Sequence, residues 1–280
     1  MINFKVTKIQ LISHKKFIMN IEKVTYHIVN WLKDYATNAG IKGYVVGVSG
    51  GIDSAITSTL CAMTGLEVLC VEMPIHQHQD HVTRAQEHIH QLKERFSNVR
   101  DVRSDLTPVF DTFINSMPDV DDNAQVDLTR GNTRARLRMT TLYYHGGVNG
   151  LLVAGTGNKV EDFGVGFYTK YGDGGVDVSP IADLMKSEVY AVGEFVNVPE
   201  SIMKAAPSDG LYGAERTDED QIGASYDELE WAMHQIDSGK TTADFTGRKK
   251  EVLSIYQDFN RRNQHKMNPI PVCIIPDELR

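Results

Sequence analysis

Residues 49–54, with the sequence SGGIDS, form a glycine-rich turn placed between two elements of different periodicity. The apolar run 44–48 before the turn is typical of a buried strand, and apolar residues recur at helical spacing after it, up to Met63. Adjacent glycines let the backbone turn sharply and present successive N–H groups, and the helix adds its positive N-terminal end. The turn is therefore suited to bind phosphate, with Ser49 and Ser54 as hydroxyl donors.

An aspartate, Asp53, stands in this turn where a P-loop would continue with a lysine and Ser or Thr. A carboxylate beside a polyphosphate repels it unless a cation lies between them. Asp53 therefore predicts Mg²⁺, held by one or two carboxylates together with phosphate oxygens. A tight turn with Asp53 as helix N-cap would explain a bare glycine pair, but the full string after a buried strand favours phosphate.

The elements around the turn alternate between strands and helices. This alternation predicts an α/β fold with a doubly wound, mainly parallel sheet and helices on both faces. We expect one domain over residues 1–280, with residues 1–43 as an N-terminal extension and helix, and a glycine-rich functional loop at 163–180. The expected strands are 44–48, 68–71 and 151–154, and the expected helices are 20–37, 54–63, 82–96, 183–195, 217–236 and 248–261.

The charge balance of the 280 residues, 29 Lys and Arg against 37 Asp and Glu, gives a net charge of −8. Such an acidic surface argues against a nucleic-acid partner. Charged residues interrupt the apolar positions of the first thirty residues, so we expect neither a signal peptide nor a membrane span, and a cytoplasmic location. Cys61, Cys70 and Cys273 form no CxxC pair and fit reduced packing thiols.

Three strings in order carry a resemblance to a known family. The SGGxDS turn resembles the signature of the PP-loop ATP pyrophosphatases. Residues 131–139, GNTRARLRM, are similar to the GNxxARxRM of NAD synthetases, and residues 155–177 are similar to that family's GT…E…TKYGDGGxD. The resemblance runs from about residue 44 to residue 266. It implies a Rossmann-like, adenine nucleotide alpha hydrolase-like fold.

The reaction that the resemblance implies is ATP-dependent amidation of nicotinic acid adenine dinucleotide (deamido-NAD) with ammonia. An adenylated carboxylate would be the intermediate, and AMP and pyrophosphate would be released with NAD. Mg²⁺ would be the cofactor, and a homodimer is the implied assembly. The glutamine-dependent relatives carry an additional amidase domain for which this chain has no room, so we expect ammonia as the nitrogen source.

The resemblance also implies roles for individual residues. Asp53 and Glu161 would bind the metal, Lys186 would meet the leaving-group oxygens, and Asp173 would orient or deprotonate ammonia, although a turn cap explains Asp173 equally well. ATP contacts are implied for Gly47, Val48, Ser49, Gly50, Gly51, Ile52, Asp53, Ser54, Thr156, Lys186 and Ser208. Contacts with deamido-NAD are implied for Asn132, Arg136, Lys170, Asp177, His265 and Lys266.

Other features of the chain admit simpler interpretations. Arg134 and Arg138 share one helix face, four residues apart, and we interpret them as forming surface salt bridges. Asp209-Gly210 and Met267 depart from the family's usual residues. His76, His78 and His81 are read as a polar loop, with a metal site as the alternative.

Two other functions stay open at this point. A PP-loop tRNA-modifying ligase is the first, and the acidic charge balance argues against it. The second is a regulatory module that holds ATP without turnover. The combination of Asp53, Glu161, Lys170 and Lys186 argues against such a module, because holding a nucleotide requires no paired magnesium carboxylates.

Overall fold

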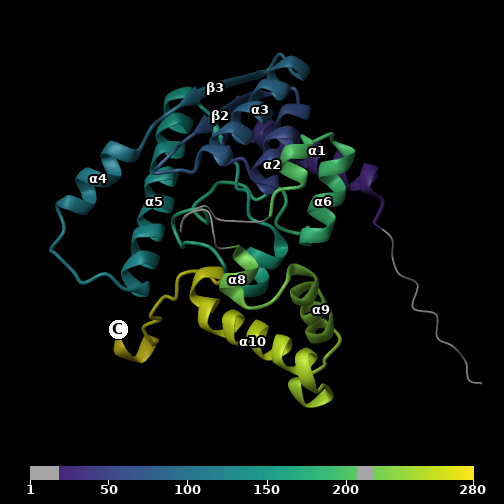
Figure 1. Ribbon diagram of the computed structural model, residues 1–280, viewed down its shortest axis with the longest axis vertical. Helices are drawn as coiled ribbons and strands as arrows, with labels where there is room; N and C mark the ends of the chain where they lie inside the picture. The colour runs from purple at the N-terminus through teal and green to yellow at the C-terminus, as the bar shows by residue number, and fades with distance from the viewer. Residues whose placement is uncertain (1–18, 207–216) are drawn as a thin grey trace, which may run out of the picture.

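A four-stranded parallel sheet forms the upper layer of the molecule in the computed structural model, which describes residues 19–206 and 217–280 (Figure 1). Its strands are β1 (Gly43–Gly47), β2 (Glu67–Glu72), β3 (Val99–Arg103) and β4 (Leu152–Val153), in the order β3-β2-β1-β4. Val45 of β1 pairs with Leu69 on one side and Val153 on the other. Strand β1 is thus central, and the carboxyl ends of all four strands lie at one edge.

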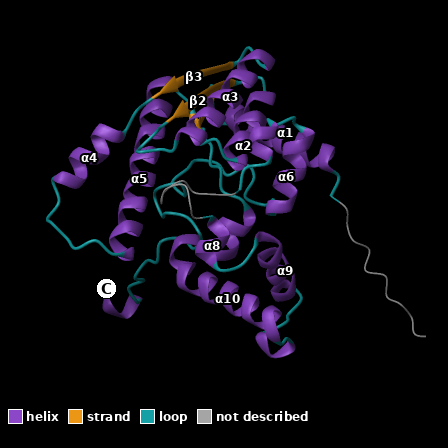
Figure 2. Cartoon of the chain, in the orientation of Figure 1, coloured by secondary structure: helices purple, strands orange, loops and turns teal. Residues whose placement is uncertain are grey.

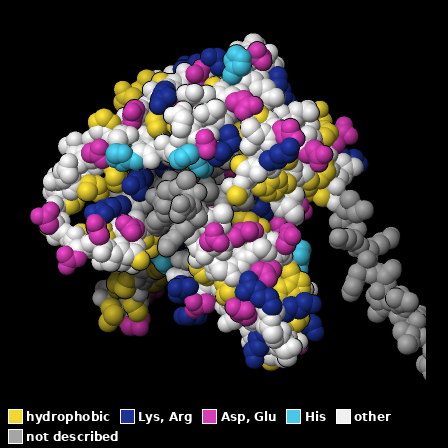
Figure 3. Space-filling view, viewed as in Figure 1, with side chains coloured by type: hydrophobic (Ala, Val, Ile, Leu, Met, Phe, Trp, Pro, Cys, Tyr) yellow, Lys and Arg dark blue, Asp and Glu magenta, His cyan; other side chains and the backbone are white. Residues whose placement is uncertain are grey.

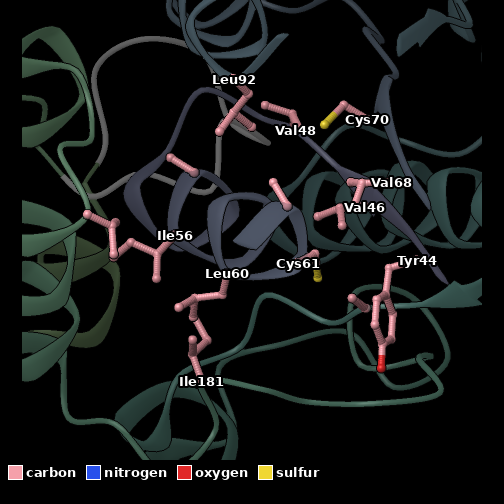
Figure 4. Packing of buried hydrophobic residues seen from close by; sticks show 14 of the residues in the cluster. Tyr44, Val46, Val48, Ile56, Leu60, Cys61, Val68, Cys70, Leu92 and Ile181 are labelled. Carbon is pink, nitrogen blue, oxygen red and sulfur yellow. The ribbon is translucent and has the colours of Figure 1, made fainter. Parts of the chain in front are cut away.

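Helices cover both faces of this sheet, which confirms the expected doubly wound α/β fold. On one face Tyr44 and Val46 pack with α1 (Ile21–Asn38), α2 (Ile52–Met63), α3 (Gln79–Arg95) and α6 (Lys186–Phe195). Figure 4 shows this cluster, with Cys61 of α2 near the strand side chains Val46 and Tyr44 and Leu60 of α2 pointing toward Ile181. On the other face Val45 and Leu69 pack with α4 (Thr107–Asn115) and α5 (Ala124–Asn149).

A second layer of helices lies below the sheet and encloses its own apolar cluster (Figure 2). It contains a π-helix, η1 (Val160–Val165), with α8 (Asp218–Ile222), α9 (Tyr226–Asp237) and α10 (Gly247–Met267). Loop segments lie between this layer and the sheet, and they carry the glycine-rich stretch expected to be functional. The remaining short helices are α7 (Glu200–Met203), η2 (Thr242–Asp244) and η3 (Asp277–Leu279).

The structure differs from the sequence expectations at several elements. The single helix expected over 217–236 is two helices, α8 and α9, because Gly223 adopts a left-handed conformation (φ 85°) that ends α8. Ser225 then begins α9 with a capping box formed with Glu228. Strand β3 and helix α4 were not expected. The strand expected at 151–154 is shorter, and Ala154 continues it only as an isolated bridge to Val178.

None of the helices within residues 19–206 and 217–280 combines the length and apolar composition needed to cross a membrane.

Candidate active site

The turn at residues 47–54 links β1 to α2 and lies at the carboxyl edge of the sheet. Gly50 has φ +83°, and a Cβ there would lie 2.4 Å from the carbonyl oxygen of His81, so no other residue fits without displacing α3. Ser54 Oγ donates to the Gly51 carbonyl at 2.9 Å and lies 3.1 Å from Ser49 Oγ. Because these contacts fix the turn locally, its backbone is preorganised before any ligand binds.

A lysine and two acids meet at the start of α2. Lys186 Nζ donates to Asp53 Oδ2 at 2.7 Å and to Glu161 Oε1 at 3.0 Å. The three side chains come from α6, α2 and η1, which are far apart in the sequence. Lys186 is only 3% exposed. We call Asp53, Glu161 and Lys186 the inner end of the site.

Asn158 holds the two acids of the inner end in place. Its Nδ2 donates to Asp53 Oδ1 at 3.1 Å, and its Oδ1 accepts the backbone N–H groups of Val160 and Glu161, both at 3.1 Å. The amide therefore caps the start of η1, which carries Glu161, and at the same time contacts the acid on α2. Asn158 is fully buried, so its contacts are screened from water.

Tyr226, at the first position of α9, completes the surroundings of Glu161. Its hydroxyl donates to Glu161 Oε1 at 2.6 Å, with Asp218 Oδ2 at 3.3 Å, and its ring faces Lys186 Nζ at 4.7 Å. The aromatic face stabilises the ammonium, while the hydroxyl stabilises the carboxylate. Glu161 thus keeps a hydrogen-bond donor other than the lysine.

The pKa values at the inner end follow from burial and from these partners. Burial lowers the pKa of Lys186, but Asp53 and Glu161 outweigh it and raise that pKa above its usual value. Burial raises the pKa of Asp53 more than Lys186 lowers it. For Glu161 burial acts in the same direction, but Lys186 and the Tyr226 hydroxyl outweigh it, so the pKa of Glu161 is lowered.

Acids outnumber bases around this point. Burial and the charges of Glu161, Asp173 and Asp53 raise the pKa of Asp162 to about 8. Its carboxyl lies against Gly157, where a Cβ would be 2.1 Å from Asp162 Oδ2. Burial also raises the pKa of Asp173, whose Oδ1 accepts the Thr169 N–H at 2.9 Å. Asp173 therefore caps its own turn, which is the simpler of the two roles expected for it. Its side chain also lines the cavity described below.

Cationic side chains also line the cavity, and we call Arg136, Lys170 and Lys266 the outer end. Arg136 Nη2 donates to the Lys170 carbonyl at 3.3 Å, and Lys170 Nζ donates to the His265 carbonyl. Lys266 Nζ donates to the carbonyls of Gly166 and Tyr168, both at 2.8 Å. Burial lowers the pKa of Lys266. Each of these contacts goes to a neutral carbonyl oxygen.

One cavity of about 900 Å³ joins the two ends. This volume is typical of a site for a nucleotide-sized ligand. Its wall includes the whole 47–54 turn, Thr156 and Asn132, whose Oδ1 accepts the Thr169 hydroxyl at 2.6 Å. His265 also lines it, with Nδ1 3.0 Å from the Arg262 carbonyl. Most of the side chains singled out from the sequence therefore surround one space.

Two of the expected site residues are not placed there. Asp177 is absent from the cavity wall: its carboxylate accepts the Tyr143 hydroxyl at 3.0 Å and the Val153 N–H at 2.8 Å. Ser208 lies outside the described residues, as does Asp209-Gly210.

Arg134, Arg138 and His76 contact neighbouring elements. Arg138 Nε donates to the Met73 carbonyl at 3.0 Å, and Arg134 lies 4.6 Å above the Phe110 ring, while the surface salt bridges expected for these two arginines stay a prediction. His76 Nε2 lies 2.7 Å from Asp111 Oδ1. Among the described residues, no group of three or more His, Cys, Asp or Glu side chains is arranged to hold a metal.

Sequence reasoning missed Asn158, Tyr226 and Asp162 as parts of the site. Asn158 carried a signal, because an Asn three residues before a Glu is the spacing of a helix cap that contacts N3. Tyr226 lies in a string, residues 223–226, that is similar to the family's, but no local pattern predicts that its hydroxyl reaches Glu161 across 65 residues of sequence.

Comparisons with known proteins identify relatives over most of the chain. The family model described as NAD synthase matches residues 24–270. An NH(3)-dependent NAD(+) synthetase of Methanosarcina mazei is 36% identical over 261 residues, covering 91% of this chain and 98% of the relative. Among solved structures, an NMN synthetase from Francisella tularensis aligns with TM-score 0.79 and 30% identity, over 93% of this chain and 100% of that chain.

A second solved structure supports the fold. The NH3-dependent NAD synthetase from Campylobacter jejuni aligns with TM-score 0.73 and 24% identity, over 91% of this chain and 100% of that chain.

Proposed function

The chain belongs to the NAD synthase family, and from that membership and the geometry of its site we propose that it makes NAD by amidating deamido-NAD with ammonia at the expense of ATP. The enzyme is then a carbon–nitrogen ligase that releases AMP and pyrophosphate. The observation that carries the proposal is the buried inner end, where Asp53, Glu161 and Lys186 meet beside a preorganised phosphate turn. The compartment we propose is the cytoplasm.

The first step joins the two ends of the site. The turn at 47–54 would bind the phosphates of ATP through its N–H groups and the Ser49 and Ser54 hydroxyls. Arg136 and Asn132 would place the pyridine carboxylate of deamido-NAD, which attacks the α-phosphorus and expels pyrophosphate. Lys186 would donate hydrogen bonds to the leaving oxygens. The protein positions two anions and screens their charge, so no covalent nucleophile is required.

A divalent cation fits the inner end. Asp53 Oδ2 and Glu161 Oε1 both converge on a position that a cationic nitrogen already holds at 2.7 and 3.0 Å, so their geometry suits a positive charge. Two carboxylates with phosphate oxygens are a usual environment for Mg²⁺, which explains why no group of three protein ligands is needed among the described residues. Bound there, Mg²⁺ would neutralise charge on the departing pyrophosphate.

The second step is the attack of ammonia on the adenylated carboxylate, with loss of AMP. Asp173 is our proposed residue for orienting ammonia, because its carboxyl lines the cavity on the loop that also carries Lys170. Burial raises the pKa of Asp173, which makes its carboxylate a stronger proton acceptor.

We also propose that the enzyme is a homodimer. Tyr144 and Val148 on α5 are 67% and 69% exposed, and the segment after α10 exposes Ile270, Val272 and Ile274. This segment forms a hydrophobic area at the lower left of Figure 3. A second copy would remove these side chains from water. Light scattering after size-exclusion chromatography measures the mass, and a monomer at micromolar concentration contradicts the proposal.

The activity is tested with the purified chain, ATP and Mg²⁺, by following pyrophosphate and NAD together. We expect pyrophosphate release to require deamido-NAD, and NAD to form with ammonium salts but not with ammonia-free glutamine alone. Because the Francisella relative is named for NMN, nicotinic acid mononucleotide is the comparison substrate. No pyrophosphate release with either acid would favour the regulatory module, and release only when tRNA is supplied would favour the tRNA-modifying alternative.

A further inference from the structure

The ammonium of Lys186 occupies the position between the two acids that the proposed function assigns to a metal. It donates to Asp53 Oδ2 at 2.7 Å and to Glu161 Oε1 at 3.0 Å, and the Tyr226 ring closes its other side at 4.7 Å. The side chain is 3% exposed, so water does not compete for these contacts. In the ligand-free inner end, a cation of the chain itself therefore already offsets part of the negative charge of the two acids.

A metal ion and this ammonium cannot share the same two oxygens. Mg²⁺ binds carboxylate oxygens at about 2.0–2.1 Å, which would bring it against an ammonium that contacts the same atoms. Two cations at that separation in a buried site repel strongly. One of the partners must therefore move when the metal enters.

The acids are the fixed partners. Asp53 keeps the Asn158 Nδ2 hydrogen bond at 3.1 Å, and its backbone starts α2. Glu161 keeps the Tyr226 hydroxyl at 2.6 Å, and Asn158 caps the helix that carries it. Neither acid would lose all its donors if the lysine left.

The lysine is the partner free to move. It stands at the first position of α6, has a flexible four-carbon stem, and lines the wall of the 900 Å³ cavity. The phosphate turn lines the same cavity. A rotation of the side chain would therefore take the ammonium from the acids to the phosphates without moving the helix.

We propose that Lys186 is a placeholder cation, which holds Asp53 and Glu161 in the nucleotide-free enzyme and is displaced onto the ATP phosphates when the divalent ion binds. This inference rests on the proposed function. Binding of the metal alone is opposed by the lysine, whereas the metal together with ATP offers the displaced ammonium new partners. The device makes metal and nucleotide bind together.

The test is Mn²⁺ binding without nucleotide, measured from the free Mn²⁺ signal by electron paramagnetic resonance at pH 8. Lys186→Met should bind Mn²⁺ roughly tenfold or more tightly than the unsubstituted enzyme, because the competing cation is gone. Lys159→Met is the matched control: Lys159 pairs with exposed Asp183 at 2.9 Å, and its loss should leave Mn²⁺ binding unchanged. Equal or weaker Mn²⁺ binding by Lys186→Met overturns the proposal.

A direct view settles the point if Lys186→Met does not fold. Crystals of the unsubstituted enzyme with Mn²⁺ and α,β-methylene-ATP should show Mn²⁺ at both acids and Lys186 beyond hydrogen-bond distance of at least one of them. Lys186 still bonded to both acids beside a bound Mn²⁺ contradicts displacement. Failure of the proposed function is separable, because it appears as an unsubstituted enzyme that releases no pyrophosphate with deamido-NAD.

Discussion

The inner and outer ends of the cavity use charge in opposite ways. At the inner end the charged groups pair with each other: Lys186 lies between Asp53 and Glu161 at 2.7 and 3.0 Å. At the outer end Arg136, Lys170 and Lys266 donate to backbone carbonyls, which satisfies their N–H groups without cancelling their charge. The inner end therefore presents surplus acid to a cation, while the outer end presents surplus positive charge to an anionic substrate.

This difference explains how one cavity accepts two anionic substrates. Acid alone would repel ATP, and base alone would bind both substrates without directing one toward the other. Acidic side chains also gather over α8, beside the cavity (Figure 3). We infer that the charge gradient between the ends orients the dinucleotide with its carboxylate toward the α-phosphorus.

The largest expected effect is at the inner end. Asp53→Asn keeps the shape of the side chain but removes the charge that would hold the metal, so pyrophosphate release should fall roughly 100-fold or more. The control is Asp183→Asn, whose carboxylate is 96% exposed and should matter less than about twofold. Near-normal release by Asp53→Asn at ordinary Mg²⁺ concentration would falsify the metal assignment.

Asn158 provides the next test, because it contacts both acids without facing the substrate. Asn158→Ala should lower pyrophosphate release by about 10- to 100-fold and raise the Mg²⁺ concentration needed for half-maximal rate. Asn98→Ala is the control, since the Asn98 side chain likewise bonds the backbone of two residues, donating to the carbonyls of Ala62 and Leu66, away from the site. If both variants lose stability alike and neither changes the Mg²⁺ dependence, Asn158 is only structural.

A smaller effect is expected at the outer end. Arg136→Lys keeps the charge but loses the planar fork, so the KM for deamido-NAD should rise by about tenfold while the KM for ATP changes little. Arg130→Lys serves as control on the same helix, where Arg130 pairs with exposed Asp122 at 2.8 Å. Equal changes in both KM values would remove the distinction between the ends.

The packing of α3 against α2, the helix that carries Asp53, makes the stability of the fold depend on pH. His88 is fully buried with Nε2 2.9 Å from Ser58 Oγ of α2, and burial lowers the pKa of His88 to about 4. The unfolded chain takes up this proton at about pH 6.5, so stability is fully present above that pH and is lost as pH falls toward 4. The loss should reach about 2 kcal/mol near pH 5.

Urea unfolding between pH 7.5 and 5 measures this loss. His88→Gln lacks the titrating group and should show a shallower decline, whereas His90→Gln, exposed on the same helix, should match the unsubstituted chain. An equally steep decline in His88→Gln would show that other groups cause the acid sensitivity.

The smallest expected effect is that of the cysteines. Burial raises the pKa of Cys61 and raises that of Cys70 to about 12, so neither thiol is a ready nucleophile, and Cys273 is exposed on the C-terminal segment. Replacing all three by Ala or Ser should change ammonia-dependent turnover by less than about twofold, if the fold survives. A large loss of turnover in a folded variant would indicate covalent chemistry.

Local and long-range parts of the site differ in how far the sequence predicts them. The phosphate turn is local, so residues 47–54 are sufficient to indicate it, and the strand and helix beside it follow from their apolar period. Contacts such as Asn158 with Asp53 join residues more than 100 positions apart, and no periodicity reports them. Asp177 matched a motif, yet its carboxylate bonds Tyr143 and a backbone N–H.

Two elements of the fold are likewise not predicted by the sequence pattern. The helical period continues through Gly223, so residues 217–236 read as one helix although the backbone turns there. Strand β3 carries Arg and Asp at its exposed edge positions, and only Val99 is buried, which hid its strand character.

In the proposed reaction, the carboxylate bound from the outer end reaches the α-phosphorus held at the inner end. Deamido-NAD labelled with ¹⁸O in its nicotinate carboxylate tests this directly, with mass spectrometry of the nucleotide product. We expect AMP carrying one ¹⁸O, together with unlabelled pyrophosphate. Unlabelled AMP, or ADP and phosphate in its place, would contradict it.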